Sequence, residues 1–228
     1  MPKFLLCPDK FKGSATSQEV ITSISKGILN VLPNAELTSQ AISDGGEGFA
    51  AIASDHMQGK WISVNAVDAL HRPLSAEYFI SKRIAYIDMS SINGLVQIEA
   101  PDRNVLHSST LGTGMLIKHA VEQQGVDKIF IGLGGSATND GGAGMAHALG
   151  ARFLNSQGEE LEPTPEQLSD CASISTTNFI PLPPIVAACD VDNPLLGENG
   201  ATAIYGPQKG LTDIPHAESI LKLSLIHI

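Results

Sequence analysis

A glycine-rich stretch that follows an apolar run is the feature of this sequence that most constrains its fold. Residues 127–133 (DKIFIGL) have the composition of a buried strand, and six glycines lie between Gly132 and Gly144. Glycine lets the backbone turn sharply and approach a ligand closely. A strand, a glycine loop and then a helix through residues 145–149 would present free backbone amides to an anion. The stretch GGSATNDGGAGM therefore predicts a phosphate- or carboxylate-binding loop in an α/β fold.

Two familiar phosphate-binding loops fit this stretch less well. A Walker loop requires a Gly-Lys-Ser/Thr sequence, which is absent here. The spacing of Gly132, Gly134 and Ala137 matches the looser dinucleotide fingerprint, but that fingerprint needs a helix that starts at about the third small residue. Residues 138–142 (TNDGG) prolong the loop instead. A dinucleotide-dependent oxidoreductase is therefore the minor alternative.

The first 56 residues have the pattern of an alternating β-α-β-α opening. Thr16 and Glu19 match a capping box at a helix start, and the apolar residues that follow recur on one helical face. The predicted order is strand 3–7, helix 16–32, strand 36–42 and helix 49–56. Such an alternation implies a parallel sheet whose loops gather at the carboxyl ends of the strands.

The pattern changes after residue 60, where short and partly alternating strands suggest a more antiparallel unit. The predicted elements are strands 61–67, 74–80 and 84–89, helix 110–123, buried strands 127–133 and 185–189, and helix 217–223. The change places a candidate domain boundary near residues 58–68.

Composition excludes several classes of partner. Charged residues make up 17% of the 228 residues, the formal net charge is −10, and no segment gathers Lys or Arg. A nucleic-acid-binding protein needs a basic surface to neutralise phosphates, so neither nucleic acid nor an anionic membrane is an expected partner. A small anion can still be bound by a few cations among backbone amides.

Location and assembly are less constrained. The three cysteines are scattered, which indicates a reducing compartment rather than a disulfide framework. No apolar run approaches the ~20 residues of a membrane helix, and the N-terminus reaches Asp9 too early for a signal peptide. We expect a cytoplasmic protein of undetermined oligomeric state.

Four shorter segments carry charged side chains next to strands or glycine turns. Asp9, Lys10 and Lys12 follow the first strand, where a lysine could stabilise a transferring phosphoryl group, although a solvated turn is equally compatible. Asp44 and Glu47 flank a glycine pair and suit metal or hydroxyl contacts, or alternatively a helix start.

The other two segments lie in the last quarter of the chain. Asp190 and Asp192 follow the predicted strand 185–189, where carboxylates could bind Mg²⁺ or accept a proton, or simply cap a turn. Lys209 sits in the glycine-bounded turn YGPQKG.

Several of these segments, in this order, resemble the type-1 glycerate kinase family. They are residues 8–14 (PDKFKGS), 44–48 (DGGEG), 111–114 (LGTG), 134–144 (GGSATNDGGAG), 189–195 (CDVDNPL) and 206–210 (GPQKG). The likeness extends from the start of the chain to about residue 222. One departure is Lys10, which stands where the family usually has serine.

The resemblance implies ATP-dependent phosphorylation of D-glycerate to 2-phosphoglycerate or 3-phosphoglycerate, with Mg²⁺. It also implies two α/β domains: a Rossmann-like parallel-sheet domain, incomplete here, and a second α/β domain inserted into it. On this basis residues 1–62 are expected to form the N-terminal part of the Rossmann-like domain and residues 63–228 the second domain. Glycerate and ATP are the expected partners.

Position within these segments suggests roles for individual residues. Lys12, Asp44 and Asp190 are the predicted catalytic residues, with Lys12 stabilising phosphoryl charge and the two carboxylates competing to accept the hydroxyl proton. Asp190 and Asp192 are the predicted metal ligands. The residues predicted to bind substrate or phosphate are Asp9, Ser14, Glu47, Gly134, Gly135, Ser136, Ala137, Thr138, Asn139, Asp140, Gly141, Gly142 and Lys209.

The resemblance also implies a longer protein, because family members continue past this point with a further glycine-rich segment. An apolar end at Ile228 without a polar tail agrees with truncation. We therefore expect the 228-residue chain to be poorly soluble or inactive alone, so that a non-catalytic fragment or binding module is a further alternative.

Overall fold

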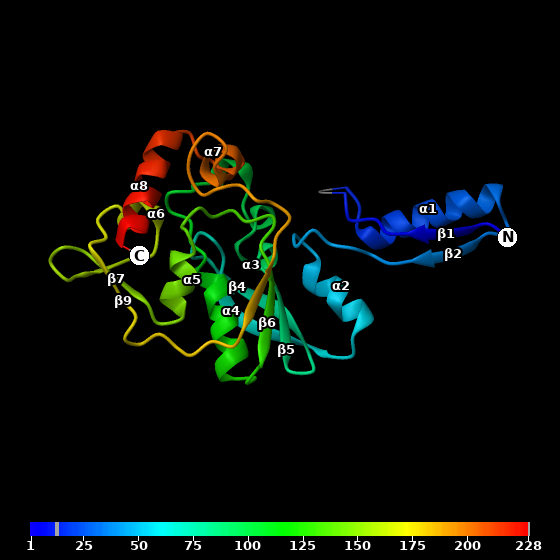
Figure 1. The fold of residues 1–228 in the computed structure, drawn as a ribbon, viewed down its shortest axis with the longest axis horizontal. Coiled ribbons are helices and arrows are strands. Elements are labelled where there is room, and N and C mark those ends of the chain that lie inside the picture. The colour runs from blue at the N-terminus through cyan, green and yellow to red at the C-terminus, as the bar shows by residue number, and fades with distance from the viewer. Residues whose placement is uncertain (12–13, 228) are drawn as a thin grey trace.

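The structure is a computed structural model that describes residues 1–11 and 14–227, with side-chain surroundings described up to Leu221. It has the mixed α/β architecture that the alternation of patterns predicted, and it contains three sheets. Figure 1 shows a narrow N-terminal arm that projects from a larger body. None of the helices in the described residues combines the length and the hydrophobicity that spanning a bilayer requires.

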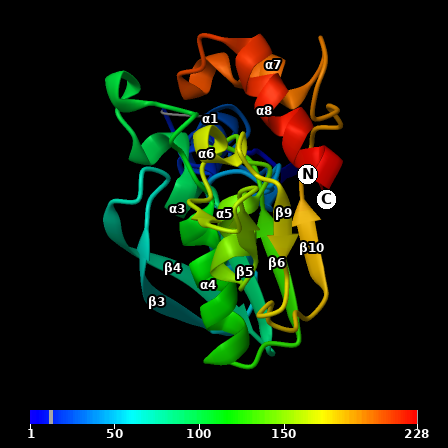
Figure 2. The same ribbon diagram turned by 90° about the vertical axis from the view of Figure 1, so that its left-hand side faces the viewer.

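The body is organised around a five-stranded sheet of order β10-β6-β5-β4-β3. Its strands are β3 (Lys60–Val67), β4 (Pro73–Ser81), β5 (Ile84–Asp88), β6 (Lys128–Gly132) and β10 (Ile185–Ala188). The β3-β4-β5 part is antiparallel, as predicted, whereas β5-β6 and β6-β10 are parallel. Figure 2 shows β3 and β10 at the two edges of this sheet.

Alternation along the strands gives the sheet two apolar faces. On one face Tyr78, Ile87 and Ile129, all fully buried, pack with Leu116 and Ile117 of α4 (Leu111–Glu122). On the other face α2 (Phe49–His56) packs its alanines against Phe79, Tyr86 and Phe130. The sheet is therefore covered by a helix on each side, and the carboxyl ends of β5, β6 and β10 share one edge.

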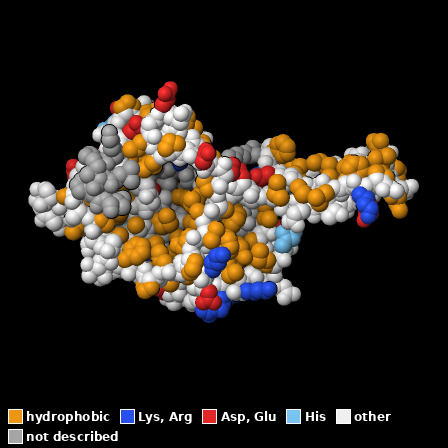
Figure 3. Space-filling model, in the orientation of Figure 1, with side chains coloured by type: hydrophobic (Ala, Val, Ile, Leu, Met, Phe, Trp, Pro, Cys, Tyr) orange, Lys and Arg blue, Asp and Glu red, His pale blue; other side chains and the backbone are white. Residues whose placement is uncertain are grey.

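The N-terminal arm consists of β1 (Lys3–Leu6), α1 (Ser17–Val31) and β2 (Glu36–Ser39). Strands β1 and β2 are parallel, with Lys3 opposite Glu36, which confirms the predicted β-α-β opening. The capping box is confirmed as well, because Thr16 accepts from the amide of Glu19 and the Glu19 carboxylate accepts from Thr16. Much of the apolar face of α1 is uncovered, however: Ile24 is 41% exposed and Val31 78%. Figure 3 shows hydrophobic side chains along this arm.

A second small region follows the five-stranded sheet. Its three-stranded sheet contains β8 (Glu160–Leu161), β7 (Arg152–Leu154) and β9 (Ser173–Ser175), and α6 (Pro165–Leu168) and α8 (Ile214–His227) lie beside it. Phe153, Leu168 and Ile220 share its core. The short strands had no recognisable pattern in the sequence, and this sheet was not predicted.

The remaining helices connect the sheets and surround the loops at the strand ends. They are α3 (Ser90–Asn93), α5 (Ala143–Ala148), α7 (Ala201–Tyr205) and the 3₁₀ helices η1 (Leu95–Gln97), η2 (Ala100–Asp102) and η3 (Pro207–Lys209).

One prediction about burial is wrong. Residues 185–189 were expected to form a buried strand, but β10 lies at the sheet edge, and its Ile185 and Val186 are 40% and 38% exposed. The apolar run does form a parallel strand on β6, but most of its residues remain exposed. The predicted boundary between residues 62 and 63 falls inside β3, and the division into two domains stays a prediction.

Candidate active site

The candidate active site lies where three loops meet at the carboxyl ends of the parallel strands. These are residues 134–144, called the signature loop below, residues 44–48, called the acidic loop, and the segment after β10. The amide of Gly134 donates to the carbonyl of Gly45 at 3.0 Å, and the amide of Leu133 donates to the carbonyl of Ala188 at 3.2 Å. Backbone hydrogen bonds therefore join the signature loop to the acidic loop, and the end of β10 to the residue that precedes the signature loop.

Glycine is required at the point of closest approach. Gly45 has a φ of +88°, and a Cβ on it would collide with the carbonyl oxygen of Ala188. A Cβ on Gly134 would lie 2.7 Å from the Cα of Gly46. The two glycine pairs thus allow the acidic and signature loops to pack backbone against backbone.

Asp140 organises the signature loop from its buried side. Its carboxylate accepts four hydrogen bonds: from the amide and the hydroxyl of Thr110, and from the amides of Gly142 and Gly144. The residue is only 3% exposed. Asp140 therefore closes the loop onto the start of α4, and its predicted contact with substrate stays a prediction.

Two further residues fix the loop from the C-terminal part of the chain. The Lys209 ammonium donates to the Ser136 hydroxyl oxygen at 2.9 Å and to the Thr138 carbonyl at 2.7 Å. The side-chain amide of Asn139 donates to the hydroxyl of Thr202, which is fully buried, at 3.3 Å. Four of the predicted binding residues are thus part of one hydrogen-bonded framework.

The same loop retains backbone donors that have no acceptor in the described part of the chain. Within the described part of the chain, no oxygen accepts a hydrogen bond from the amides of Gly135, Ser136, Thr138, Asn139, Asp140 and Gly141. Gly135 and Gly141 are exposed. Neighbouring amides without an intramolecular acceptor are suited to bind an anionic oxygen.

The length of the loop also bears on the dinucleotide alternative. Helix α5 begins at Ala143, whereas a dinucleotide fingerprint would require a helix from about Ala137. The geometry therefore disfavours that alternative.

The acidic loop faces the segment after β1. The Asp44 carboxylate accepts from the amide of Gly46 at 2.7 Å and lies 3.8 Å from the Lys10 ammonium. Asp9 lies at the same distance from Lys10 on the other side. The Lys10 nitrogen is buried and has no hydrogen-bond partner among the described residues. The structure thus brings Asp9 and Asp44 together around Lys10, which the sequence analysis placed in the first loop but did not include among the predicted site residues.

Asp88, at the end of β5, is a site residue that the sequence reasoning missed. Its carboxylate accepts from the amide of Gly48 at 2.6 Å and from the hydroxyl of Ser90 at 2.6 Å. Burial raises the pKa of Asp88, and the hydrogen bonds and the charge of Lys10 oppose that shift. The only signal in the sequence was a carboxylate directly after an apolar strand.

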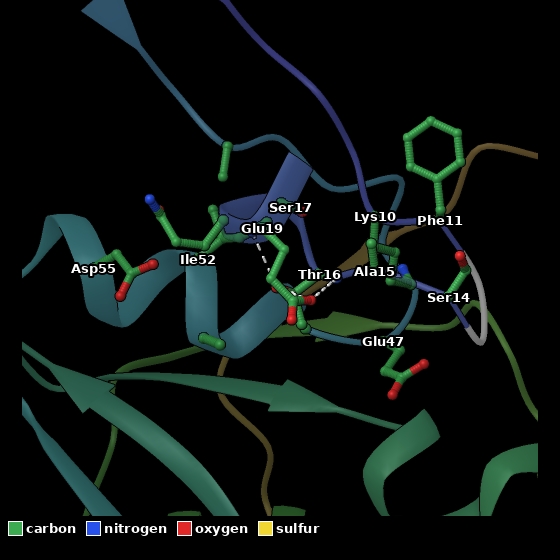
Figure 4. Close-up of a pocket in the computed structure, with 14 residues that line it drawn as sticks. Lys10, Phe11, Ser14, Ala15, Thr16, Ser17, Glu19, Glu47, Ile52 and Asp55 are labelled. Atoms are coloured by element: carbon green, nitrogen blue, oxygen red, sulfur yellow. Dashed lines mark hydrogen bonds between the residues drawn. The ribbon is translucent and has the colours of Figure 1, made fainter. Parts of the chain in front are cut away.

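A cavity of about 550 Å³ opens beside these loops. Its lining includes Lys10, Ser14 and Glu47 near the site and Ile52 and Asp55 of α2. Figure 4 shows the capping pair Thr16 and Glu19 between Asp55 on one side and Ser14 on the other. The predicted residues Ser14 and Glu47 therefore share one cavity with Lys10.

The remaining predicted residues are not part of this network. Asp190 and Asp192 follow β10 with exposed side chains, and neither makes a hydrogen bond or ion pair with another described residue. No group of three or more His, Cys, Asp or Glu within the described residues is arranged to hold a metal ion. Lys12 lies outside the described residues.

Comparison with known proteins agrees with the geometry. The sequence profile of the glycerate kinase family matches residues 4–224. A glycerate kinase from Halalkalibacterium halodurans is 42% identical over 217 residues, and a glycerate 2-kinase from Escherichia coli is 38% identical over 216. A crystal structure from Salmonella typhimurium LT2, assigned as glycerate kinase 2, superposes with a TM-score of 0.81 at 38% identity.

These matches cover nearly all of this chain but only part of each relative. The aligned regions are 93%, 92% and 97% of this chain, in the order given above. They are 57%, 56% and 62% of the matched proteins. The chain therefore spans less than two thirds of the length of the proteins it matches.

Proposed function

Because the chain belongs to the glycerate kinase family, we propose that it carries the phosphate- and substrate-binding loops of an ATP-dependent glycerate kinase. The observation that carries this proposal is the signature loop, a run of unused amides at the carboxyl end of β6, supported from behind by Asp140 and Lys209. Phosphoryl transfer depends mainly on positioning and on stabilising charge. A fixed array of amide donors supplies both.

The proposed reaction is direct transfer between two oxygens. A hydroxyl oxygen of D-glycerate attacks the γ-phosphorus of ATP, the bond from that phosphorus to the β-γ bridging oxygen breaks, and ADP leaves. The hydroxyl proton passes to a carboxylate. We assign this role to Asp44, which is partly exposed and borders the signature loop, with Asp190 as the competing candidate.

The proposed product is 2-phosphoglycerate. The name of the E. coli relative, glycerate 2-kinase, supports this choice. The competing product, 3-phosphoglycerate, would require the other hydroxyl to face the phosphoryl donor.

Magnesium is the expected companion of ATP, and the available carboxylates suit it. Mg²⁺ in kinases is usually held by one or two carboxylates together with substrate phosphates and water. Asp190 and Asp192, exposed and without partners among the described residues, would hold it. The bound ion would offset charge on the phosphates, while Lys12 and Lys10 would act on the same charge from the first loop.

A coupled ADP-release assay over a panel of short hydroxy acids tests this proposal. The assay should use the chain itself and the chain fused to the part of the H. halodurans glycerate kinase that it does not match. We expect ADP release with D-glycerate and ATP in the fused protein, with ³¹P NMR identifying 2-phosphoglycerate. Asp102→Asn, an exposed carboxylate outside the site, is the matched control for Asp44→Asn and Asp190→Asn.

Two outcomes would contradict the proposal. Stabilisation by glycerate or ATP without ADP release from the fused protein would indicate a non-catalytic binding module. Stabilisation by NAD alone would indicate a dinucleotide-dependent oxidoreductase.

A further inference from the structure

Lys209 is a charged residue whose ammonium points into the protein instead of toward solvent. It ends η3 in the turn YGPQKG, and its ammonium donates to the Ser136 hydroxyl oxygen and the Thr138 carbonyl. Its stem is partly exposed, but burial of the ammonium lowers the pKa of Lys209 to about 8, with the Asp140 carboxylate opposing the shift. Burying a charged ammonium costs free energy, so the two contacts that hold it there require an explanation.

The contact with Ser136 determines where that hydroxyl can point its proton. The oxygen of Ser136 accepts from Lys209, and an ammonium cannot accept a proton in return. Within the described residues no other group accepts from the Ser136 hydroxyl. Its proton is therefore left for an acceptor outside the protein.

The contact with Thr138 removes an acceptor from the loop. A free carbonyl oxygen beside an anion would repel it, because both carry negative charge. Lys209 binds this carbonyl at 2.7 Å, while the amides of Ser136 and Thr138 have no acceptor among the described residues. Lys209 thus occupies the Thr138 carbonyl, while the amides of Ser136 and Thr138 remain free to donate.

We propose that Lys209 is a positioning residue that leaves the Ser136 hydroxyl and the amides of Ser136 and Thr138 free to donate to an anionic phosphate or carboxylate oxygen of the ligand. It acts through Ser136 and Thr138 and does not itself touch the ligand. The loop's affinity for an anion belongs to this inference, whereas the identity of the ligand as glycerate or ATP rests on the proposed function.

The turn that carries Lys209 is itself held in place. The guanidinium of Arg103 donates to the carbonyl of Gln208 at 3.1 Å, and the amide of Gly210 donates to the carbonyl of Pro207 at 3.1 Å. Gly210 has a φ of +89°, and a Cβ there would collide with the carbonyl oxygen of Arg103. The ammonium is therefore presented from a fixed turn, as preorganisation of a binding loop requires.

The test is a double-mutant cycle on anion binding by the full chain. Dissociation constants for inorganic phosphate and for D-glycerate would be measured by NMR titration for wild type, Lys209→Met, Ser136→Ala and the double variant. We expect each single variant to bind phosphate about tenfold more weakly, and the double variant to bind no more weakly than Lys209→Met, because both substitutions break the same contact. Lys26→Met, which removes an exposed lysine of α1, should bind as wild type does.

Stability separates this role from simple support of the fold. Urea unfolding of the same four proteins would show whether the coupling appears in binding or only in stability. Equal phosphate affinity in wild type and Lys209→Met overturns the inference. It is also overturned if the losses of phosphate affinity in the two single variants multiply in the double variant. A wild-type chain that binds neither probe overturns it as well. Coupled phosphate binding without ADP release would leave the role of Lys209 intact and contradict the proposed function alone.

Discussion

Two buried carboxylates each tie one glycine loop to the framework of the molecule. Asp88 accepts from Gly48 of the acidic loop, and Asp140 accepts from two amides of the signature loop and from Thr110. Glycine-rich loops lose a large amount of conformational entropy when they become ordered. At the scale of single residues, the hydrogen bonds that these carboxylates accept offset the entropic cost of ordering the two loops.

Asp140→Asn tests this role. An amide has one acceptor oxygen, so the substitution turns an NH₂ group toward backbone amides that now lack an acceptor. We expect the free energy of unfolding to fall by about 2–4 kcal/mol, because several buried donors lose a charged partner. Urea unfolding measures this change, and Asp102→Asn should leave the free energy of unfolding as it is in wild type.

Lys209 predicts a pH dependence of stability. Its folded-state pKa of about 8 lies below the ordinary value of 10.5, so between these values the unfolded chain binds more protons. Stability therefore rises with pH through this window, as the folded protein sheds the buried charge.

The measurement compares wild type with Lys209→Met across that window. Wild type should gain up to about 3 kcal/mol of unfolding free energy relative to the variant. If the free energies of unfolding of the two proteins change with pH in parallel, the Lys209 ammonium is not buried in the folded protein.

At the scale of elements, the packing of the two glycine loops predicts the effect of one methyl group. In Gly134→Ala the new Cβ would meet the Cα and the amide nitrogen of Gly46 at 2.7 and 3.0 Å. The loops must then separate, and we expect a loss of about 1–3 kcal/mol in unfolding free energy, together with weaker phosphate binding.

Gly27→Ala is the matched control for this substitution. Gly27 lies within α1 with no other atom near its Cβ position. The same methyl group should therefore stabilise the chain by about 0.5–1 kcal/mol, as alanine does inside a helix. Destabilisation by both variants would mean that the effect at Gly134 is not specific to the loop contact.

The order of helices and strands could be predicted because its signals are local. The capping box of α1, the apolar run of β6 and the glycine run of the signature loop each lie within a few residues. The edge position of β10 and the three-stranded sheet could not be predicted, since both depend on pairing between segments that are distant or very short.

The same distinction holds for the site. The signature loop was predicted as a contiguous stretch, but its supports are remote: Thr110 lies 30 positions from Asp140, and Lys209 lies 71 from Thr138. A sequence pattern identifies a charged residue near a loop without showing which atoms it binds. The roles of Asp88, Asp140 and Lys209 therefore emerged only from the structure.

At the scale of the whole molecule, the exposed apolar face of the arm predicts self-association. Val31 and Leu5 are 78% and 67% exposed, and apolar residues continue along α1. We expect the chain to associate reversibly in sedimentation velocity as concentration rises, and Ile24→Glu with Val31→Glu to reduce this association. Ser23→Glu, an exposed polar position on the same helix, should not. A monomer at every concentration would contradict the expectation.

Along the chain the arm is joined to the body by the segment after β2, and the segment after β1 meets that connection at the candidate site. The segment after β1 carries Asp9 and Lys10, and the segment after β2 leads into Asp44 and the acidic loop. Figure 1 shows the arm extending away from this junction. A rotation of the arm about this junction would displace Lys10 relative to Asp44, because the acidic loop is hydrogen-bonded to the signature loop. Contacts made by the arm would thereby set the distance between these two charged groups.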